Sequence, residues 1–96
     1  MQAETIIGAQ IRAARGALNW SVKDLAERTG VGTATIVRYE MAEGEPPTRK
    51  GNLDLIRRAL EAAGIEFTGS AQGAPGIVMH FHLRTKVQKS ATVAEG

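Results

Sequence analysis

The sequence predicts a mainly α-helical domain of four to five helices, followed by a C-terminal β-hairpin. The chain has 96 residues, 43% of them hydrophobic, which is enough to bury one modest core. Aromatic residues make up only 4% of the chain and alanine is frequent, and this favours short, closely packed helices over a sheet sandwich. Apolar side chains recur at helical spacing in four stretches, and they alternate with polar ones only after residue 64.

Composition also excludes several classes of protein. The chain has no cysteine, which excludes a disulfide framework and a thiolate metal site. No apolar run approaches the length of a membrane span, and the N-terminal residues lack the apolar region of a signal peptide. We therefore expect a soluble, cytoplasmic protein that does not bind a membrane. The net charge is only +2, so a nucleic-acid-binding surface would require basic residues gathered on one face.

The first two helices are predicted at residues 5–18 and 22–29. In the first, apolar side chains recur every three or four positions. The second is preceded by Ser21, and Asp24 follows three residues later, which is a capping-box pattern. Gly30 is suited to the left-handed conformation that ends a helix.

Two further helices are predicted after a very tight turn. The first covers residues 33–41, and a loop with paired prolines follows at residues 43–47. The second covers residues 52–63, where apolar residues share one helical face, and Thr48 and Asn52 are the candidate caps at its start.

Beyond residue 64 the pattern changes to that of a β-hairpin. Residues 65–68 and 77–83 alternate apolar and polar side chains, and residues 69–76 between them are rich in Gly, Ser and Ala. We therefore predict a helical domain over residues 1–64, a hairpin over residues 65–84 and a disordered tail over residues 85–96, which lacks periodicity and large apolar side chains.

Two short helices joined by a tight turn, with one more helix on each side, present a rigid helix to the major groove of DNA. Residues 12–40, RAARGALNWSVKDLAERTGVGTATIVRYE, resemble the Cro/repressor type of helix-turn-helix, the XRE-like family of bacterial and phage regulators. The resemblance extends over residues 7–64, and its most specific part is LAERTGVGTATIVRYE. That segment carries the apolar, small and turn residues of the family, namely Leu25, Ala26, Gly30, Val31 and Ile36, followed by Glu40.

The resemblance implies sequence-specific binding to double-stranded DNA by the third helix. Arg38 can make a bidentate contact to guanine, whereas small apolar side chains pack on thymine methyl groups. The alternative for Arg38 is an ordinary solvated residue. The positions that the resemblance assigns to base contacts are Thr33, Ala34, Val37 and Arg38.

A second set of residues is predicted to contact DNA phosphates. Free backbone N–H groups and the helix dipole favour a phosphate at the start of the second helix. Gly32 stands where the family usually has a Ser or Thr cap, which removes a hydroxyl. Arg49 and Lys50 follow the proline loop, and a solvated basic pair is the alternative there. The predicted phosphate contacts are Asn19, Ser21, Lys23, Gly32, Arg49 and Lys50.

The resemblance also implies a partly buried salt bridge between Arg15 and Glu40, the alternative being two solvated surface charges. His80 and His82 share one face of the predicted second strand. No third metal ligand is evident, so we interpret them as exposed strand histidines and expect neither a metal nor a cofactor.

Proteins of this kind bind two half-sites as symmetric dimers, so a dimer surface is required. The hairpin is the candidate because a two-stranded hairpin is marginal unless it packs or pairs. The alternative is that it folds onto the fourth or first helix. The residues predicted to form the homodimer interface are Ile65, Phe67, Met79, Phe81 and Leu83.

The sequence therefore predicts a DNA-binding transcriptional regulator, acting as a repressor on a palindromic operator. One alternative is an antitoxin or phage-type regulator that also binds a partner protein. Another is a protein-interaction module without DNA binding. This alternative stays open because Glu43 and Glu45 are acidic, and because Ala34 and Val37 have no polar side-chain groups. We do not expect an enzyme, because the sequence shows no nucleophile with a base, no paired carboxylates and no phosphate-binding glycine loop.

Overall fold

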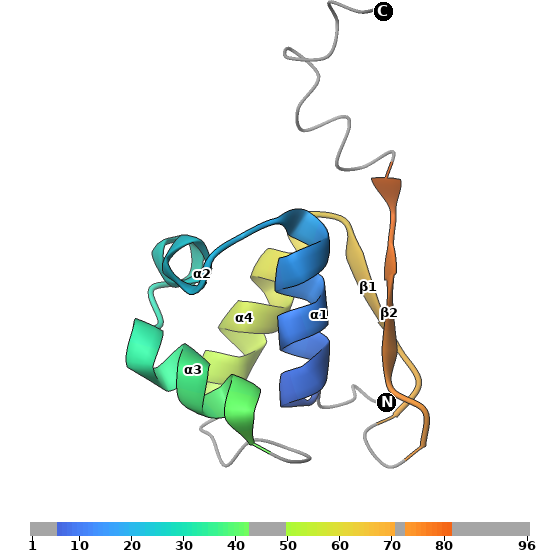
Figure 1. Ribbon diagram of the computed structural model, residues 1–96, viewed down its shortest axis with the longest axis horizontal. Helices are drawn as coiled ribbons and strands as arrows, with labels where there is room; N and C mark the ends of the chain where they lie inside the picture. The colour runs from blue at the N-terminus through green and yellow to red at the C-terminus, as the bar shows by residue number, and fades with distance from the viewer. Residues whose placement is uncertain (1–5, 43–49, 71–72, 82–96) are drawn as a thin grey trace, which may run out of the picture.

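The computed structural model describes residues 6–42, 50–70 and 73–81. In this part of the chain, four helices are followed by an antiparallel two-stranded hairpin, which confirms the predicted fold class (Figure 1). The elements are α1 (Gly8–Leu18), α2 (Val22–Thr29), α3 (Thr33–Met41), α4 (Lys50–Ala62), β1 (Ile65–Thr68) and β2 (Gly76–Met79).

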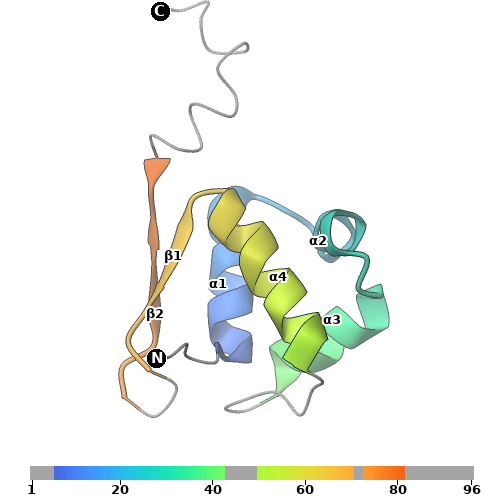
Figure 2. The ribbon, with the colours of Figure 1, turned by 180° about the vertical axis from the view of Figure 1, so that it is seen from behind.

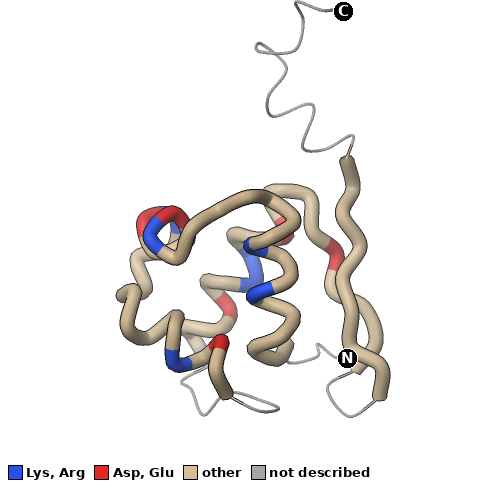
Figure 3. The backbone as a smooth tube through the Cα atoms, viewed as in Figure 1, with Lys and Arg blue, Asp and Glu red and all other residues tan. Residues whose placement is uncertain are grey.

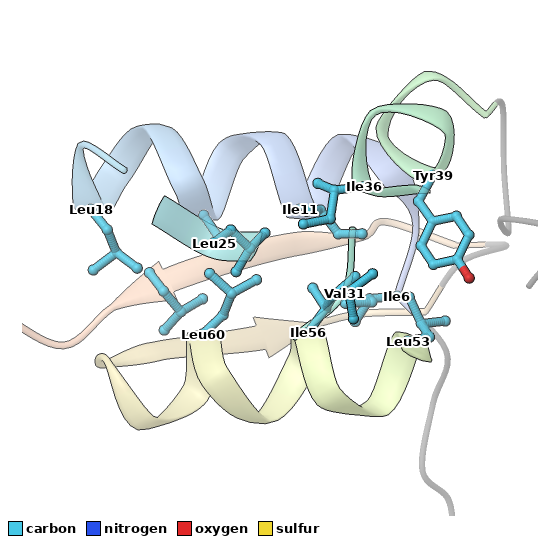
Figure 4. Packing of buried hydrophobic residues seen from close by; sticks show 12 residues of the cluster. Ile6, Ile11, Leu18, Leu25, Val31, Ile36, Tyr39, Leu53, Ile56 and Leu60 are labelled. Carbon is cyan, nitrogen blue, oxygen red and sulfur yellow. The ribbon is translucent and has the colours of Figure 1, made fainter. Parts of the chain in front are cut away.

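The helices α1 and α4 lie side by side between the helix-turn-helix and the hairpin. The helices α2 and α3 lie on one side of this pair, and β1 and β2 lie on the other, as the front and back views show (Figures 1 and 2). The helix α3 packs against α1 and α2, and α2 packs against α4. The hairpin packs on the central pair, with β2 against α1 and β1 against α4. The core between them is aliphatic apart from Tyr39 (Figure 4). Its buried members are Ile6, Ile11, Ala14, Leu18, Leu25, Val31, Ile36, Tyr39, Leu53, Ile56, Leu60 and Ile65.

The helix α1 differs from the prediction at its start, and it ends on a backbone conformation that periodicity did not predict. It starts at Gly8, three residues later than predicted, and residues 1–5 lie outside the described part of the chain. Asn19 ends it in the left-handed conformation, with φ of 61°. The Asn19 N–H bonds to the Gly16 carbonyl at 3.1 Å and the Trp20 N–H to the Arg15 carbonyl at 2.9 Å, a Schellman pattern in which Asn takes the place of Gly.

The helix α4 begins at Lys50 rather than at the predicted Asn52. Asn52 is therefore not a cap. It lies in the first turn, where its Nδ2 donates to the hydroxyl of Tyr39 at 3.3 Å and so links α4 to α3. The other candidate cap, Thr48, and the proline loop at 43–47 lie outside the described residues. Gly64 follows α4 with φ of 106°, as a helix-terminating glycine does.

The hairpin pairs Ile65 with Met79 and Thr68 with Gly76. Its second strand ends at Met79, which is shorter than the predicted 77–83. His82, Leu83 and the predicted tail at 85–96 lie outside the described residues.

The hairpin packs on its own helical domain, which is the alternative that the sequence left open. Ile65 is only 2% exposed and belongs to the core, and Phe67 and Met79 pack against that core. Gln10, 5% exposed, fixes the hairpin to α1 because its Nε2 donates to the Gly76 carbonyl at 2.9 Å. Ile65 is thus unavailable to a second copy, because the marginal hairpin buries its apolar face on α1 and α4.

Phe81 differs from Ile65, Phe67 and Met79, because 66% of it is exposed. On the opposite face of the hairpin, His80 Nε2 lies 2.7 Å from Glu66 Oε1. Among the residues that the structure describes, no three His, Cys, Asp or Glu side chains come together to hold a metal ion. None of the described helices has the length and hydropathy of a membrane span.

Candidate nucleic-acid interface

The start of α2 is fixed by the predicted capping box. The Ser21 hydroxyl accepts from the Asp24 N–H at 2.9 Å, and the Asp24 carboxylate accepts from the Ser21 N–H at 2.9 Å. These bonds from Ser21 favour the charged carboxylate, so they lower the pKa of Asp24 below its ordinary value. These two hydrogen bonds fix the first turn of α2, and the Asp24 carboxylate gives it a negative charge.

Replacing Asp24 with Asn is expected to make the free energy of unfolding less dependent on pH in the acidic range. Because the pKa of Asp24 is lowered in the folded state, its contribution is complete above the unfolded value of about 3.9 and is lost as pH falls through the folded value. The measurement is urea unfolding of both proteins at pH 6 and pH 3. The gap in unfolding free energy between wild type and Asp24→Asn should narrow at pH 3, and a gap of equal size at both pH values would contradict the assignment.

The turn between α2 and α3 is held by one glycine and one threonine. Gly30 has φ of 80°, in the left-handed conformation predicted for it, and its N–H bonds to the Ala26 carbonyl at 2.8 Å. The Thr29 hydroxyl donates to the Leu25 carbonyl at 2.8 Å and accepts from the Val31 N–H at 3.1 Å. Val31 itself is 5% exposed and packs in the core. The angle between the two helices is therefore set by backbone bonds and by a buried side chain.

The side chains of α3 divide into a buried and an exposed set. Ile36, Tyr39 and Glu40 are 0%, 2% and 4% exposed. The four positions predicted to contact bases are all exposed, and they recur at the spacing of one helical face. We call this set the reading face: Thr33, Ala34, Val37 and Arg38.

The reading face carries little charge. Figure 3 shows basic and acidic positions interspersed along the helices, and Arg38 is the only basic residue of α3. The other three side chains of the face end in methyl groups, and Val37 is 42% exposed. Met41, 74% exposed, extends the apolar surface at the end of α3, although the sequence did not single it out. The face thus offers one bidentate donor among several apolar contacts.

A buried ion pair fixes the C-terminal end of α3 to α1. Arg15 Nε lies 2.8 Å from Glu40 Oε2, and Arg15 Nη2 lies 2.9 Å from Glu40 Oε1, so the pair is bidentate. The side chain of Glu40 is 5% exposed and that of Arg15 is 21% exposed. Hydrogen bonding to this carboxylate raises the pKa of the Arg15 guanidinium. Arg12 adds a bond from its Nη1 to the Glu40 carbonyl.

The same end of α3 approaches the backbone of α1 very closely. A Cβ atom on Gly8 would lie 2.4 Å from the Tyr39 carbonyl oxygen and 2.8 Å from the Glu40 carbonyl oxygen. Backbone atoms cannot move aside as a flexible side chain can. Gly8 is therefore needed where α1 meets α3. Local sequence patterns could not predict this requirement, because the two helices are distant in the chain.

Replacing Gly8 with Ala is expected to destabilise the protein by about 1–2 kcal/mol. The clash with two carbonyl groups costs about 1–3 kcal/mol, and the better helix propensity of Ala offsets part of it. Urea unfolding measures the change. Gly16→Ala is the control, because a Cβ there meets nothing within 4 Å, and it should not destabilise the protein through a clash. A Gly8→Ala protein as stable as Gly16→Ala would contradict the close approach.

The predicted phosphate contacts cluster only in part. Asn19, Ser21 and Lys23 are exposed around the junction of α1 and α2, but Asn19 also caps α1 and Ser21 caps α2. Gly32 is exposed at the start of α3, which has no side-chain cap there. Arg49 lies outside the described residues, and of Lys50 only the backbone, as the first residue of α4, is described.

One further cation lies at this junction. The guanidinium of Arg28 stands 4.1 Å from the ring centroid of Trp20, within the range of a cation–π contact. Arg28 is exposed and comes two helical turns after Ser21, so the two share a face of α2. That spacing, next to Trp20 before the cap, is a signal from which the contact could have been predicted.

Comparison with known proteins agrees with this geometry. A family model described as "Helix-turn-helix" matches residues 11–50, from the second turn of α1 to the first residue of α4. No curated protein matches the sequence. The matched segment contains α2, the turn and α3 with its reading face, and the family consists of DNA-binding regulators. Residues 11–50 are therefore similar to the XRE-type helix-turn-helix, in agreement with the resemblance found in the sequence.

Proposed function

We propose that the protein is a sequence-specific transcriptional repressor that inserts α3 into the major groove of a palindromic operator and binds as a dimer. The observation that carries the proposal is that the side chains of α3 divide into a buried side and an exposed side. Its inner side is fixed by Ile36, Tyr39 and the Arg15–Glu40 pair, while the whole reading face is exposed. A rigid helix with one face free is what insertion into a groove requires.

The reading face predicts the kind of base contacts. Arg38 donates two hydrogen bonds to O6 and N7 of a guanine, a contact worth about 1–3 kcal/mol of discrimination. Ala34, Val37 and the Thr33 methyl group pack against thymine methyl groups. A half-site with one guanine among thymines fits this chemistry.

The phosphate contacts come from the start of α2 and of α3. Lys23 supplies the charge beside the first turn of α2, and Arg28, positioned on Trp20, adds a second cation to that helix. Backbone N–H groups at Gly32 and after it face no side-chain cap. These groups set the register of the protein on DNA rather than the sequence it prefers.

Repression is the regulatory outcome that needs the fewest contacts. A protein seated on an operator excludes other proteins from the same DNA, whereas activation requires a further surface that contacts the transcription machinery. Two copies on a palindrome would place two α3 helices in major grooves about 10 base pairs, or a multiple of that, apart.

The proposal is tested by the binding of random-sequence duplex DNA at several salt concentrations, followed by fluorescence anisotropy. DNA binding through Lys23, Arg28 and Arg38 predicts that log K falls linearly with log salt. Absence of binding, or binding that does not respond to salt, would reject the proposal in favour of a protein-interaction module. If the protein also binds a partner protein, the complex of the two should still bind DNA with an affinity that falls as salt rises.

A further inference from the structure

Most arginines in the described part of the chain are bonded to an oxygen atom of the protein. Those with a carboxylate or carbonyl partner are Arg12, Arg15, Arg57 and Arg58. Among the same described residues, Arg28 and Arg38 have neither a hydrogen bond nor an ion pair. Arg38 already belongs to the reading face. Arg28 is therefore the remaining described arginine whose N–H donors are available to a ligand.

Arg28 lies over the ring of Trp20, with its guanidinium carbon 4.1 Å from the ring centroid. A guanidinium that stacks on an aromatic face keeps its in-plane N–H donors free for oxygen acceptors. Asp24 would be the alternative partner, because it precedes Arg28 by one helical turn, at the spacing of helical ion pairs. Both residues are described, and the structure shows the ring contact rather than an ion pair between them. The donors of Arg28 are thus open to an acceptor from outside the protein.

Trp20 is itself held in place by Arg15. The Trp20 N–H bonds to the Arg15 carbonyl at 2.9 Å, and the Trp20 carbonyl accepts from Arg15 Nη1 at 3.0 Å. The same guanidinium binds the Glu40 carboxylate at the end of α3. The ring of Trp20 is partly buried and packs against the core. The surface on which Arg28 rests is therefore fixed to α1 and, through the Arg15–Glu40 pair, to α3.

The ring contact brings the charge of Arg28 to the residue beside the cap of α2. Trp20 directly precedes the cap Ser21, whereas Arg28 lies in the last turn of that helix. Ser21 and Lys23 are the residues that the proposed function places against a DNA phosphate. The Asp24 carboxylate in the same turn would repel that phosphate, and a second cation next to Lys23 offsets this repulsion.

We propose that Trp20 is a positioning residue for DNA binding, which holds the Arg28 guanidinium ready to bind a phosphate of the DNA backbone. This inference rests on the proposed function, because it assumes that the protein binds DNA. A long side chain loses conformational freedom when it binds a ligand, and that loss weakens binding. The ring of Trp20 restricts Arg28 before DNA arrives, so part of this loss has already occurred in the free protein.

A double-mutant cycle on random-sequence duplex DNA, measured over a series of salt concentrations, tests this role. Arg28→Gln should reduce the slope of log K against log salt by about 1, because one phosphate contact is lost. Trp20→Leu should leave the slope unchanged and lower the affinity about two- to fivefold, since Arg28 keeps its charge but loses the ring. In the Arg28→Gln background, Trp20→Leu should have no further effect on affinity.

Two further variants separate positioning from a structural role. Trp20→Phe keeps an aromatic face and should retain most of the affinity that Trp20→Leu loses. Arg58→Gln removes an exposed cation of α4, with 76% of its side chain exposed, and should leave the salt slope unchanged. If Trp20→Leu weakens binding equally with and without Arg28, or if Arg28→Gln leaves the slope unchanged, the inference is wrong while the proposed function stands. A wild-type protein that does not bind DNA rejects both.

The fluorescence of Trp20 reports the ring contact without DNA, because Trp20 is the one tryptophan of the chain. Arg28 covers one face of the ring, so Arg28→Gln should increase the quenching of this fluorescence by acrylamide. Arg58→Gln is again the control and should quench as the wild type does. Equal quenching of Arg28→Gln and the wild type would show that Arg28 does not rest on the ring in solution, which would overturn the inference.

Discussion

Replacing Glu40 with Ala is expected to lower the free energy of unfolding by about 3 kcal/mol. Glu40 is 5% exposed, and its carboxylate is the bidentate partner of Arg15. Its removal leaves the guanidinium partly buried without its counter-charge, and breaking a buried pair in this way costs about 3–5 kcal/mol. We take the lower end because 21% of the Arg15 side chain reaches solvent.

Urea unfolding at pH 7 measures this effect, and a second ion pair of the same chain is the control. Arg57 and Glu61 form an exposed pair on α4 with an Nε–Oε2 distance of 3.0 Å. Pairs of this kind are worth about 0.3–0.5 kcal/mol, so Glu61→Ala should change stability far less than Glu40→Ala. Equal effects of the two substitutions would show that the Arg15–Glu40 pair does not hold α3 against α1.

Replacing Arg38 with Ala is expected to relax the preference for one base pair in each half-site by about tenfold to a hundredfold. Arg38 is the only basic side chain of α3 and belongs to the reading face. Loss of a bidentate contact to guanine removes about 1–3 kcal/mol of discrimination at that position. The measurement is a set of affinities for an operator and for its single-base variants.

Lys23→Ala is the comparison for Arg38→Ala, because Lys23 is an exposed cation of α2 rather than of the reading face. It should lower affinity evenly across the variants and reduce the salt slope by about 1. If Arg38→Ala also lowers affinity evenly, Arg38 contacts a phosphate. If Lys23→Ala alters base preference, the placement of α2 on the DNA backbone is wrong.

Local patterns were enough to predict the helix-turn-helix. The Ser21–Asp24 capping box and Gly30 are signals within a few residues, so the ends of α2 followed from the sequence. Periodicity also predicted that Ile36 and Tyr39 face inward, whereas the four positions of the reading face were expected from the resemblance to the family. The bidentate contact of Arg15 with Glu40 was expected only from the resemblance to a family, because no local rule links residues 25 positions apart.

The contacts that the sequence did not predict join distant parts of the chain. Gly8 meets the end of α3, and Gln10 holds the hairpin through the Gly76 carbonyl. Neither residue stands out in periodicity, since a glycine and a glutamine fit a surface helix equally well. For the same reason, the sequence left open whether the hairpin packs on its own domain, and Ile65 proved to belong to the core.

Selection of duplexes from a pool of random DNA, followed by sequencing, tests most directly whether α3 reads an operator. We predict an enriched palindromic site whose two half-sites are centred about 10 base pairs, or a multiple of that, apart, each with one guanine among thymines. Recovery of the input distribution without enrichment would contradict sequence-specific binding. Enrichment of a single asymmetric half-site would contradict the symmetric dimer.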